Sequence, residues 1–170
     1  MPDALIIADA ADVFPALALA AQTGAHVLLK SVPDAIAPAD IPPGTRLYVP
    51  PELAARFPGA RVAIFCPLTG QPLFSLLRHH RLRFGARAAA VFRPGALRAE
   101  LRAGCPAALS SADIGEISGQ ARFSPACVCA YTLARAENGL DAVLFDTEKT
   151  LSRRRALCRR LGVESIVLLG

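Results

Sequence analysis

Short apolar runs recur along the chain, separated by alanine-rich, amphipathic or proline-rich segments. Short apolar runs bounded by Gly, Pro or charged residues are typical of strands that are buried on both faces of a sheet. The pattern predicts strands at residues 4–8, 26–29, 46–49, 61–65, 88–92, 142–145 and 165–169.

Segments with helical character alternate with these runs. Asp12 is placed to cap an alanine-rich helix that Gly24 ends, and Ser124-Pro125 has the residue types preferred at an N-cap and a first helical position. Thr147 or Thr150 is expected to cap the last helix. The predicted helices cover residues 12–23, 51–57, 73–85, 94–103, 124–137 and 151–161.

This alternation predicts the fold class. We expect a single α/β domain over residues 1–170, with an open, mostly parallel, doubly wound (Rossmann-like) sheet and helices on both faces. The proline-rich segment 32–44 is expected to be a loop, and residues 104–123 to be irregular, with one short strand around Ile114.

Composition agrees with a well-buried core. The chain of 170 residues has 53% hydrophobic and 19% charged residues, which fits a sheet covered by helices and a homo-oligomer interface. Its apolar stretches are shorter than the ~20 residues of a transmembrane helix. Asp3, Asp9 and Asp12 interrupt the region where a signal peptide would need basic and then apolar residues. We therefore expect a cytoplasmic protein without membrane contact.

The five cysteines are irregularly spaced and form no CxxC pair. The usual zinc and thioredoxin signatures are thus missing, and buried reduced thiols are the expected state. Glycine-rich nucleotide-binding motifs are also missing, so the sequence predicts no particular cofactor or metal.

Positive charge is concentrated in the middle of the chain. Residues 61–112 contain eight arginines and one glutamate, whereas residues 1–60 contain three basic and six acidic residues. The helix with Arg78, Arg81 and Arg83 is expected to present a solvated basic face, and the arginines of residues 153–160 a charged surface. Nucleic acid is an unlikely partner, because the chain has no Trp and only two Tyr for stacking on bases.

Residues that directly follow strands are the candidates for a functional site. Ligands of parallel sheets bind at the carboxyl ends of the strands. Asp9 and Asp146 could act as acids, bases or metal ligands, Cys66 as a nucleophile, and Arg93 as a clamp for an anion. Lys30 and Pro50 also follow strands.

The segment from Cys66 to Phe74 resembles the C-P-x-T-G-Q-P-D-F motif of the nitrile reductases of queuosine biosynthesis. This resemblance implies that Cys66 is a nucleophile. Apart from the resemblance, Cys66 follows a predicted strand in a loop with Thr69 and Gly70, and its thiol is expected to be exposed. Together with Arg93, Thr69 and Gly70 are the candidates for binding the substrate. Leu73 occupies the position of that family's aspartate, and the resemblance covers about ten residues. The tunnelling fold of that family, mainly antiparallel, also differs from the alternation described above.

Asp146 begins a segment that resembles the D-x-D-x-T-L motif of haloacid-dehalogenase phosphatases, with Glu148 in place of the second Asp. That family needs further motifs over a longer chain, so the start of a helix is the preferred interpretation.

The leading hypothesis is a protein that binds an anionic, phosphate- or carboxylate-bearing small molecule at the carboxyl edge of its sheet, with catalysis open. The alternative is a non-catalytic subunit or protein–protein interaction domain. A nucleic-acid-associated protein that uses its basic middle third is the weakest of the three.

Overall fold

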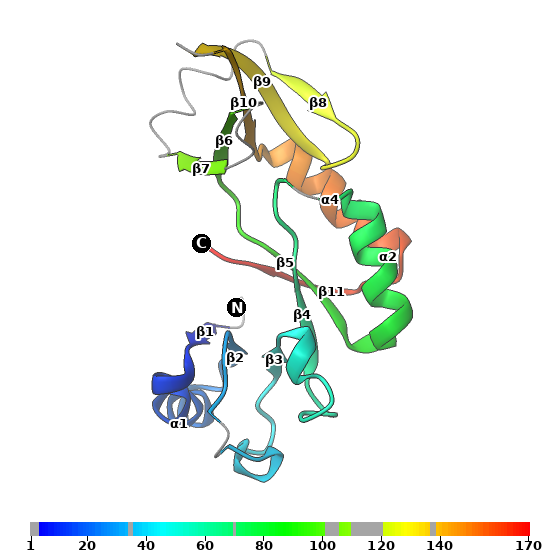
Figure 1. Ribbon diagram of the computed structural model, residues 1–170. Coiled ribbons are helices and arrows are strands. Elements are labelled where there is room, and N and C mark those ends of the chain that lie inside the picture. The colour runs from blue at the N-terminus through cyan, green and yellow to red at the C-terminus, as the bar shows by residue number, and fades with distance from the viewer. Residues whose placement is uncertain (1–3, 34–35, 70, 101–105, 110–120, 137–138) are drawn as a thin grey trace. The chain divides into compact units, whose positions relative to one another are not determined.

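A computed structural model describes residues 4–33, 36–69, 71–100, 106–109, 121–136 and 139–170 (Figure 1). The chain divides into two compact units. The first unit comprises Met1–Ile64 and Phe84–Ala89, and the second comprises Phe65–Arg83 and Ala90–Gly170. The single domain expected from the sequence stays a prediction.

The first unit contains short parallel strands. β1 (Leu5–Ala8) pairs with β2 (His26–Leu29), β2 pairs with β3 (Leu47–Val49), and β3 pairs with β4 (Arg61–Phe65), all in parallel. These strands match their predicted ranges to within one residue at each end. Pro50 directly follows β3 and Pro67 comes two residues after β4, and proline cannot donate to a sheet ladder.

Helix α1 (Val13–Thr23) packs on β1 and β2. Its buried side chains recur at helical spacing and form one face: Val13, Ala16, Leu17 and Ala20. The helix begins after Asp12, as predicted, although the Asp12 side chain forms no capping hydrogen bond. It ends at Gly24, whose φ of 70° lies in the left-handed region that glycine enters without strain.

Two further elements connect the parallel strands. The predicted helix at residues 51–57 is only a 3-10 turn (Pro51–Leu53) followed by other turns. Helix α2 (Leu73–Phe84) confirms the predicted basic helix, and β5 (Ala88–Phe92) confirms the strand after it.

The parallel strands belong to a six-stranded sheet with the order β1-β2-β3-β4-β5-β11, in which β11 is Ser165–Leu168. This order follows the chain without a reversal. A doubly wound sheet reverses its order at a switch point, whereas a β/α barrel places each strand beside the preceding one. The α/β class and the mostly parallel sheet are therefore confirmed, but the described strands do not have the predicted Rossmann-like order.

Between β5 and β11 the chain forms a second, antiparallel sheet that the sequence analysis did not predict. Its strand order is β7-β6-β10-β9-β8. The strands are β6 (Ala96–Glu100), β7 (Pro106–Leu109), β8 (Arg122–Ser124), β9 (Cys129–Ala136) and β10 (Gly139–Phe145).

Two predicted helices in this region are wrong. Residues 94–103 contain β6, and residues 124–137 contain the end of β8, a turn and β9. Local signals such as Ser124-Pro125 predicted helix starts. In the structure, β6 instead pairs with β10, and Glu100 of β6 lies opposite Asp141 of β10. Such long-range pairing overrides local preference. The strand expected around Ile114 lies outside the described residues, and that at residues 142–145 is confirmed as part of β10.

Helix α4 (Glu148–Arg160) follows β10 and confirms the preferred interpretation of that segment as a helix start. Thr147 is its N-cap: the Thr147 hydroxyl accepts a hydrogen bond from the Thr150 amide at 3.2 Å. The Thr150 hydroxyl in turn accepts one from the Thr147 amide at 2.8 Å. Across the described residues, no helix is long and apolar enough to cross a membrane.

Candidate ligand-binding site

Two loops that follow β4 and β5 form a cavity in the second unit. The Cys66 amide donates to the Val91 carbonyl at 3.0 Å and so holds the ends of the two strands together. The cavity has a volume of about 460 Å³. Its lining residues are Phe65, Cys66, Pro67, Leu68, Val91, Arg93, Pro94, Gly95, Ala96 and Leu97. It lies at the carboxyl ends of the strands, the edge at which sheets and barrels of this class bind ligands.

Two of the predicted site residues, Cys66 and Arg93, come together in this cavity. Arg93 is exposed, and no described residue forms a hydrogen bond or an ion pair with it. No described residue therefore competes with a ligand for the donors of its guanidinium.

The Cys66 thiol is 5% exposed. Burial raises its pKa to about 12, the neighbouring Cys158 adds to this effect, and Arg154 opposes it. The group is therefore a neutral thiol at physiological pH, and the thiolate is the form that attacks electrophiles. The proposed nucleophilic role of Cys66 stays a prediction to which the surroundings of the thiol give no support.

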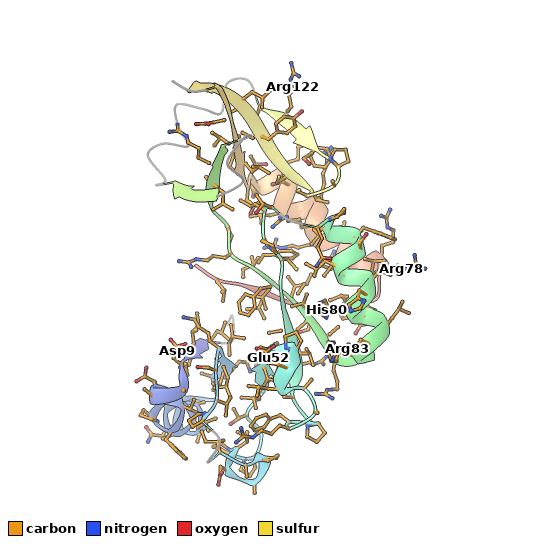
Figure 2. All side chains as sticks on the ribbon, viewed as in Figure 1. Asp9, Glu52, Arg78, His80, Arg83 and Arg122 are labelled. Carbon is orange, nitrogen blue, oxygen red and sulfur yellow. The ribbon has the colours of Figure 1, made fainter. Side chains whose placement is uncertain are left out.

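The other predicted residues of the strand ends lie elsewhere. Asp9, at the end of β1 in the first unit, forms an exposed ion pair with Lys30 at 3.6 Å (Figure 2). Thr69 is half-buried and is not among the residues that line the cavity. Gly70 lies outside the described residues.

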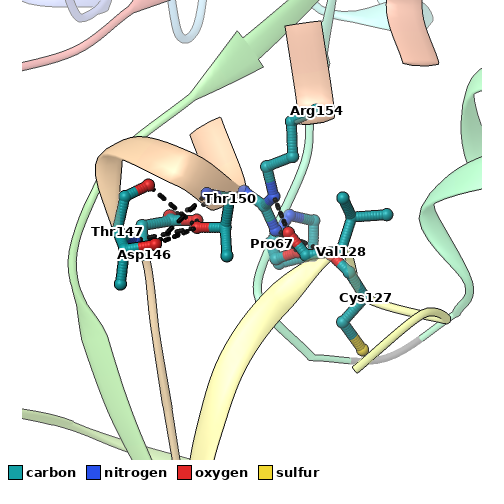
Figure 3. Close-up of polar contacts among 7 residues, drawn as sticks. All are labelled: Pro67, Cys127, Val128, Asp146, Thr147, Thr150 and Arg154. Carbon is teal, nitrogen blue, oxygen red and sulfur yellow. Dashed lines mark hydrogen bonds and ion pairs between the residues drawn. The ribbon is translucent and has the colours of Figure 1, made fainter. Parts of the chain in front are cut away.

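Asp146 forms an ion pair with Arg154 inside the second unit (Figure 3). Their side chains are 1% and 0% exposed, and Oδ2 of Asp146 lies 3.5 Å from Nη1 of Arg154. Burial raises the pKa of Asp146, while Arg154 and a hydrogen bond from Thr150 oppose this shift. Neither of the two paired atoms has a hydrogen-bond partner among the described residues, so the contact is purely electrostatic.

This buried pair connects both walls of the cavity. Arg154 donates to the Pro67 carbonyl at 3.3 Å, and Pro67 belongs to the wall that follows β4. The Asp146 amide donates to the Gly95 carbonyl at 3.0 Å, and Gly95 belongs to the wall that follows β5. The geometry indicates that Asp146 supports the cavity without lining it.

Arg154 also holds a strained turn. It donates to the carbonyls of Cys127 at 3.2 Å and Val128 at 3.3 Å (Figure 3). Val128 has a φ of 54°, which is costly for a β-branched side chain. The guanidinium also lies 5.2 Å from the centre of the Phe92 ring.

The arginines of residues 153–160 were expected to form a charged surface, and for Arg154 that prediction is wrong, because its side chain is buried. A signal was available, because Arg154 shares the helical spacing of the other buried residues of α4: Thr150, Leu157 and Cys158. An arginine on the apolar face of a helix predicts a buried partner.

The basic helix α2 agrees with a mainly solvated face. Arg78 and Arg83 are exposed, whereas Arg81 donates to the Gly162 carbonyl at 3.0 Å (Figure 2). Within the described part of the chain, no group of three or more His, Cys, Asp or Glu side chains could hold a metal ion.

The sequence matches no protein-family profile and no curated protein. Solved structures do resemble the chain. The spore cortex-lytic enzyme SleL of Bacillus cereus aligns with a TM-score of 0.63 and 13% identity, over 97% of this chain and 55% of that one. A chitinase of Chromobacterium violaceum aligns with a TM-score of 0.60 and 13% identity, over 94% and 66% of the two chains.

The chitinase-like agglutinin RobpsCRA of Robinia pseudoacacia aligns with a TM-score of 0.50 and 16% identity, over 94% of this chain and 56% of that one. These three solved structures share their fold with this chain. It is a fold that carbohydrate-processing proteins use, and the chain spans about half the length of the SleL structure. The unreversed strand order agrees with this likeness, since β/α barrels add their strands in chain order.

Proposed function

We propose that this chain binds a saccharide in the cavity at the carboxyl ends of β4 and β5. The observation that carries the proposal is the position of the cavity, because this edge is the ligand-binding edge of barrels with the same strand order. The names of the similar structures, a cortex-lytic enzyme, a chitinase and a chitinase-like agglutinin, support a carbohydrate as the ligand.

The side chains of the cavity suit such a ligand. Phe65, the last residue of β4, is 44% exposed and offers an aromatic surface to the apolar face of a sugar ring. Small-molecule sites combine an apolar lining with a few polar groups that fix orientation, and Arg93 supplies such a group. The anionic ligand that the sequence analysis predicts would meet Arg93 in this cavity.

Binding is better supported than hydrolysis. Most glycosidases place two carboxyl groups on either side of the scissile bond. The lining residues that the structure describes include no carboxylate, and Asp146 is paired with Arg154 and does not line the cavity. Catalytic roles for Asp9, Cys66 and Asp146 stay predictions.

Binding of chitotetraose, a neutral oligomer of N-acetylglucosamine, tests the proposal. Titration of isotope-labelled protein followed by NMR should shift the amide signals of Phe65, Cys66 and Leu68 and of residues 95–97. We expect Phe65→Ser to weaken binding about tenfold, since aromatic contacts contribute about 0.5–1.5 kcal/mol beyond area burial.

Phe74→Ser is the matched control, because Phe74 is 42% exposed on α2 and does not line the cavity. It should leave the affinity unchanged. If chitotetraose and other oligosaccharides shift no signals from the cavity, or if both variants weaken binding equally, the proposed site is wrong.

A further inference from the structure

The charge of the cavity is concentrated on one residue. Among the described residues that line it, Arg93 alone is charged at neutral pH, because the Cys66 thiol stays protonated. The other described lining residues have apolar side chains, except Gly95, which has none. An exposed guanidinium beside apolar walls is the main polar determinant that this site offers to a ligand.

The buried carboxylates that the structure describes in the second unit already have arginine partners. Asp141 lies 3.7 Å from Arg98, and its side chain is 10% exposed. Asp146 lies 3.5 Å from Arg154. Neither carboxylate pairs with Arg93, so no carboxylate among the described residues of this unit compensates the charge of this arginine at the cavity.

We infer that the saccharide is acidic and that its carboxylate pairs with Arg93. This inference rests on the proposed function and specifies the class of saccharide. A guanidinium presents its donors as a planar fork that fits both oxygens of one carboxylate. One arginine balances the charge of one carboxylate group, whereas a phosphate monoester carries about −1.5 to −2 on a single group and would exceed the charge that Arg93 supplies at its position.

Three tetrasaccharides distinguish the contribution of the carboxylate to binding from that of the sugar rings. Hyaluronan tetrasaccharide alternates glucuronate with N-acetylglucosamine, its methyl ester has the same rings without the charge, and chitotetraose has no carboxyl group. Their dissociation constants are measured by calorimetry with the wild-type protein, with Arg93→Gln and with Arg78→Gln. Arg78 is an exposed arginine of α2 that does not line the cavity, and so serves as the matched control.

We expect the wild-type protein to bind the acid about tenfold or more tightly than the methyl ester, because hydrogen bonds to charged groups are the stronger ones. Arg93→Gln should bring the affinity for the acid down to that for the ester and leave the ester unchanged. Arg78→Gln should retain the preference.

Each other outcome has a distinct meaning. Equal affinity of the wild-type protein for acid and ester overturns the inference but leaves saccharide binding intact. A preference for the acid that survives in Arg93→Gln, or disappears equally in Arg78→Gln, also overturns it. If none of the three tetrasaccharides binds, the proposed function fails, and the inference fails with it.

Discussion

Removal of Arg154 should destabilise the protein through the carboxylate that it leaves behind. Arg154→Met keeps a long apolar side chain but removes the partner of Asp146, which is 1% exposed. Loss of one member of a buried ion pair costs about 3–5 kcal/mol, because the other charge stays buried without compensation. We expect a loss of this size in the free energy of unfolding at pH 7.

Asp146→Asn removes the opposite charge and should cost clearly less at pH 7, because burial already favours the uncharged form of the Asp146 carboxyl over the carboxylate. Here the group left without its charged partner is a guanidinium, which cannot lose its proton. Arg154 still keeps its hydrogen bonds to the carbonyls of Pro67, Cys127 and Val128. In the double variant, the losses should fall short of additivity by about 0.5–3 kcal/mol, the usual coupling of residues in contact.

The stability losses of the two single variants, relative to the wild-type protein, should change with pH in opposite directions. Burial raises the folded-state pKa of Asp146 above its ordinary value of 3.8, so the folded protein binds this proton more tightly than the unfolded chain. The resulting stability is complete below pH 3.8 and is lost as the pH rises through the folded-state pKa.

Arg154→Met raises that pKa further, because the guanidinium that lowers it is gone. Its stability deficit relative to the wild-type protein should therefore grow from pH 4 towards neutrality. Asp146→Asn does not titrate, so its deficit should narrow over the same range.

Urea unfolding followed by far-ultraviolet circular dichroism measures these differences, since the chain has no Trp for fluorescence. Wild-type protein, both single variants and the double variant are compared at pH 4, 5.5 and 7. Additive losses in the double variant, a loss below about 1 kcal/mol in Arg154→Met at pH 7, or parallel pH trends would refute the account of a coupled buried pair.

Two further predictions concern a thiol and a turn. Cys66 is 5% exposed and has a pKa raised to about 12, so it should resist iodoacetamide at pH 8, and the half-buried Cys127 should be alkylated before Cys66. Peptide mapping by mass spectrometry shows the order of the two, and equal labelling would contradict the burial of Cys66. Gly24→Ala should cost about 1–2 kcal/mol in thermal or urea unfolding, because Gly24 has a φ of 70°. Gly59→Ala is the control, with open space for the new Cβ and no positive φ, and a comparable loss there would remove the conformational explanation.

The parallel strands were predictable because their signals are local. The apolar runs at β1, β2 and β4 are short, continuous and bounded by polar residues, Gly or Pro, and the structure places strands on them. The caps at Gly24 and Thr147 were also readable from residue type, since each acts within one turn of its helix.

The antiparallel sheet could not be predicted in this way. β6 contains the alanine- and leucine-rich sequence ALRAE, which suits a helix, and it becomes a strand because β10 pairs with it from far along the chain. The residues of β6 and β9 do not indicate which strands these two strands pair with.

The residues of the candidate site were predictable from local sequence, but their arrangement in space was not. Cys66 and Arg93 were identified as strand-end residues, but their proximity depends on β4 and β5 being neighbours, and strand order is a property of the whole sheet. Asp9, chosen by the same rule, ends a strand at the edge of that sheet and forms a surface ion pair.

The hydrogen bond from the Asp146 amide to the Gly95 carbonyl joins the two ends of the segment that carries the antiparallel sheet. The chain enters the antiparallel sheet and leaves it at nearly one point. Closing a longer loop adds only about 0.6 kcal/mol for each doubling of length, so a segment with adjoining ends can gain or lose residues at little cost to the strands around it. Gly95 lines the cavity, so insertions and deletions here would reshape its rim. Among descendants of one ancestor, ligand preference could thus diverge by changes in length alone, while the residues of the parallel sheet stay the same.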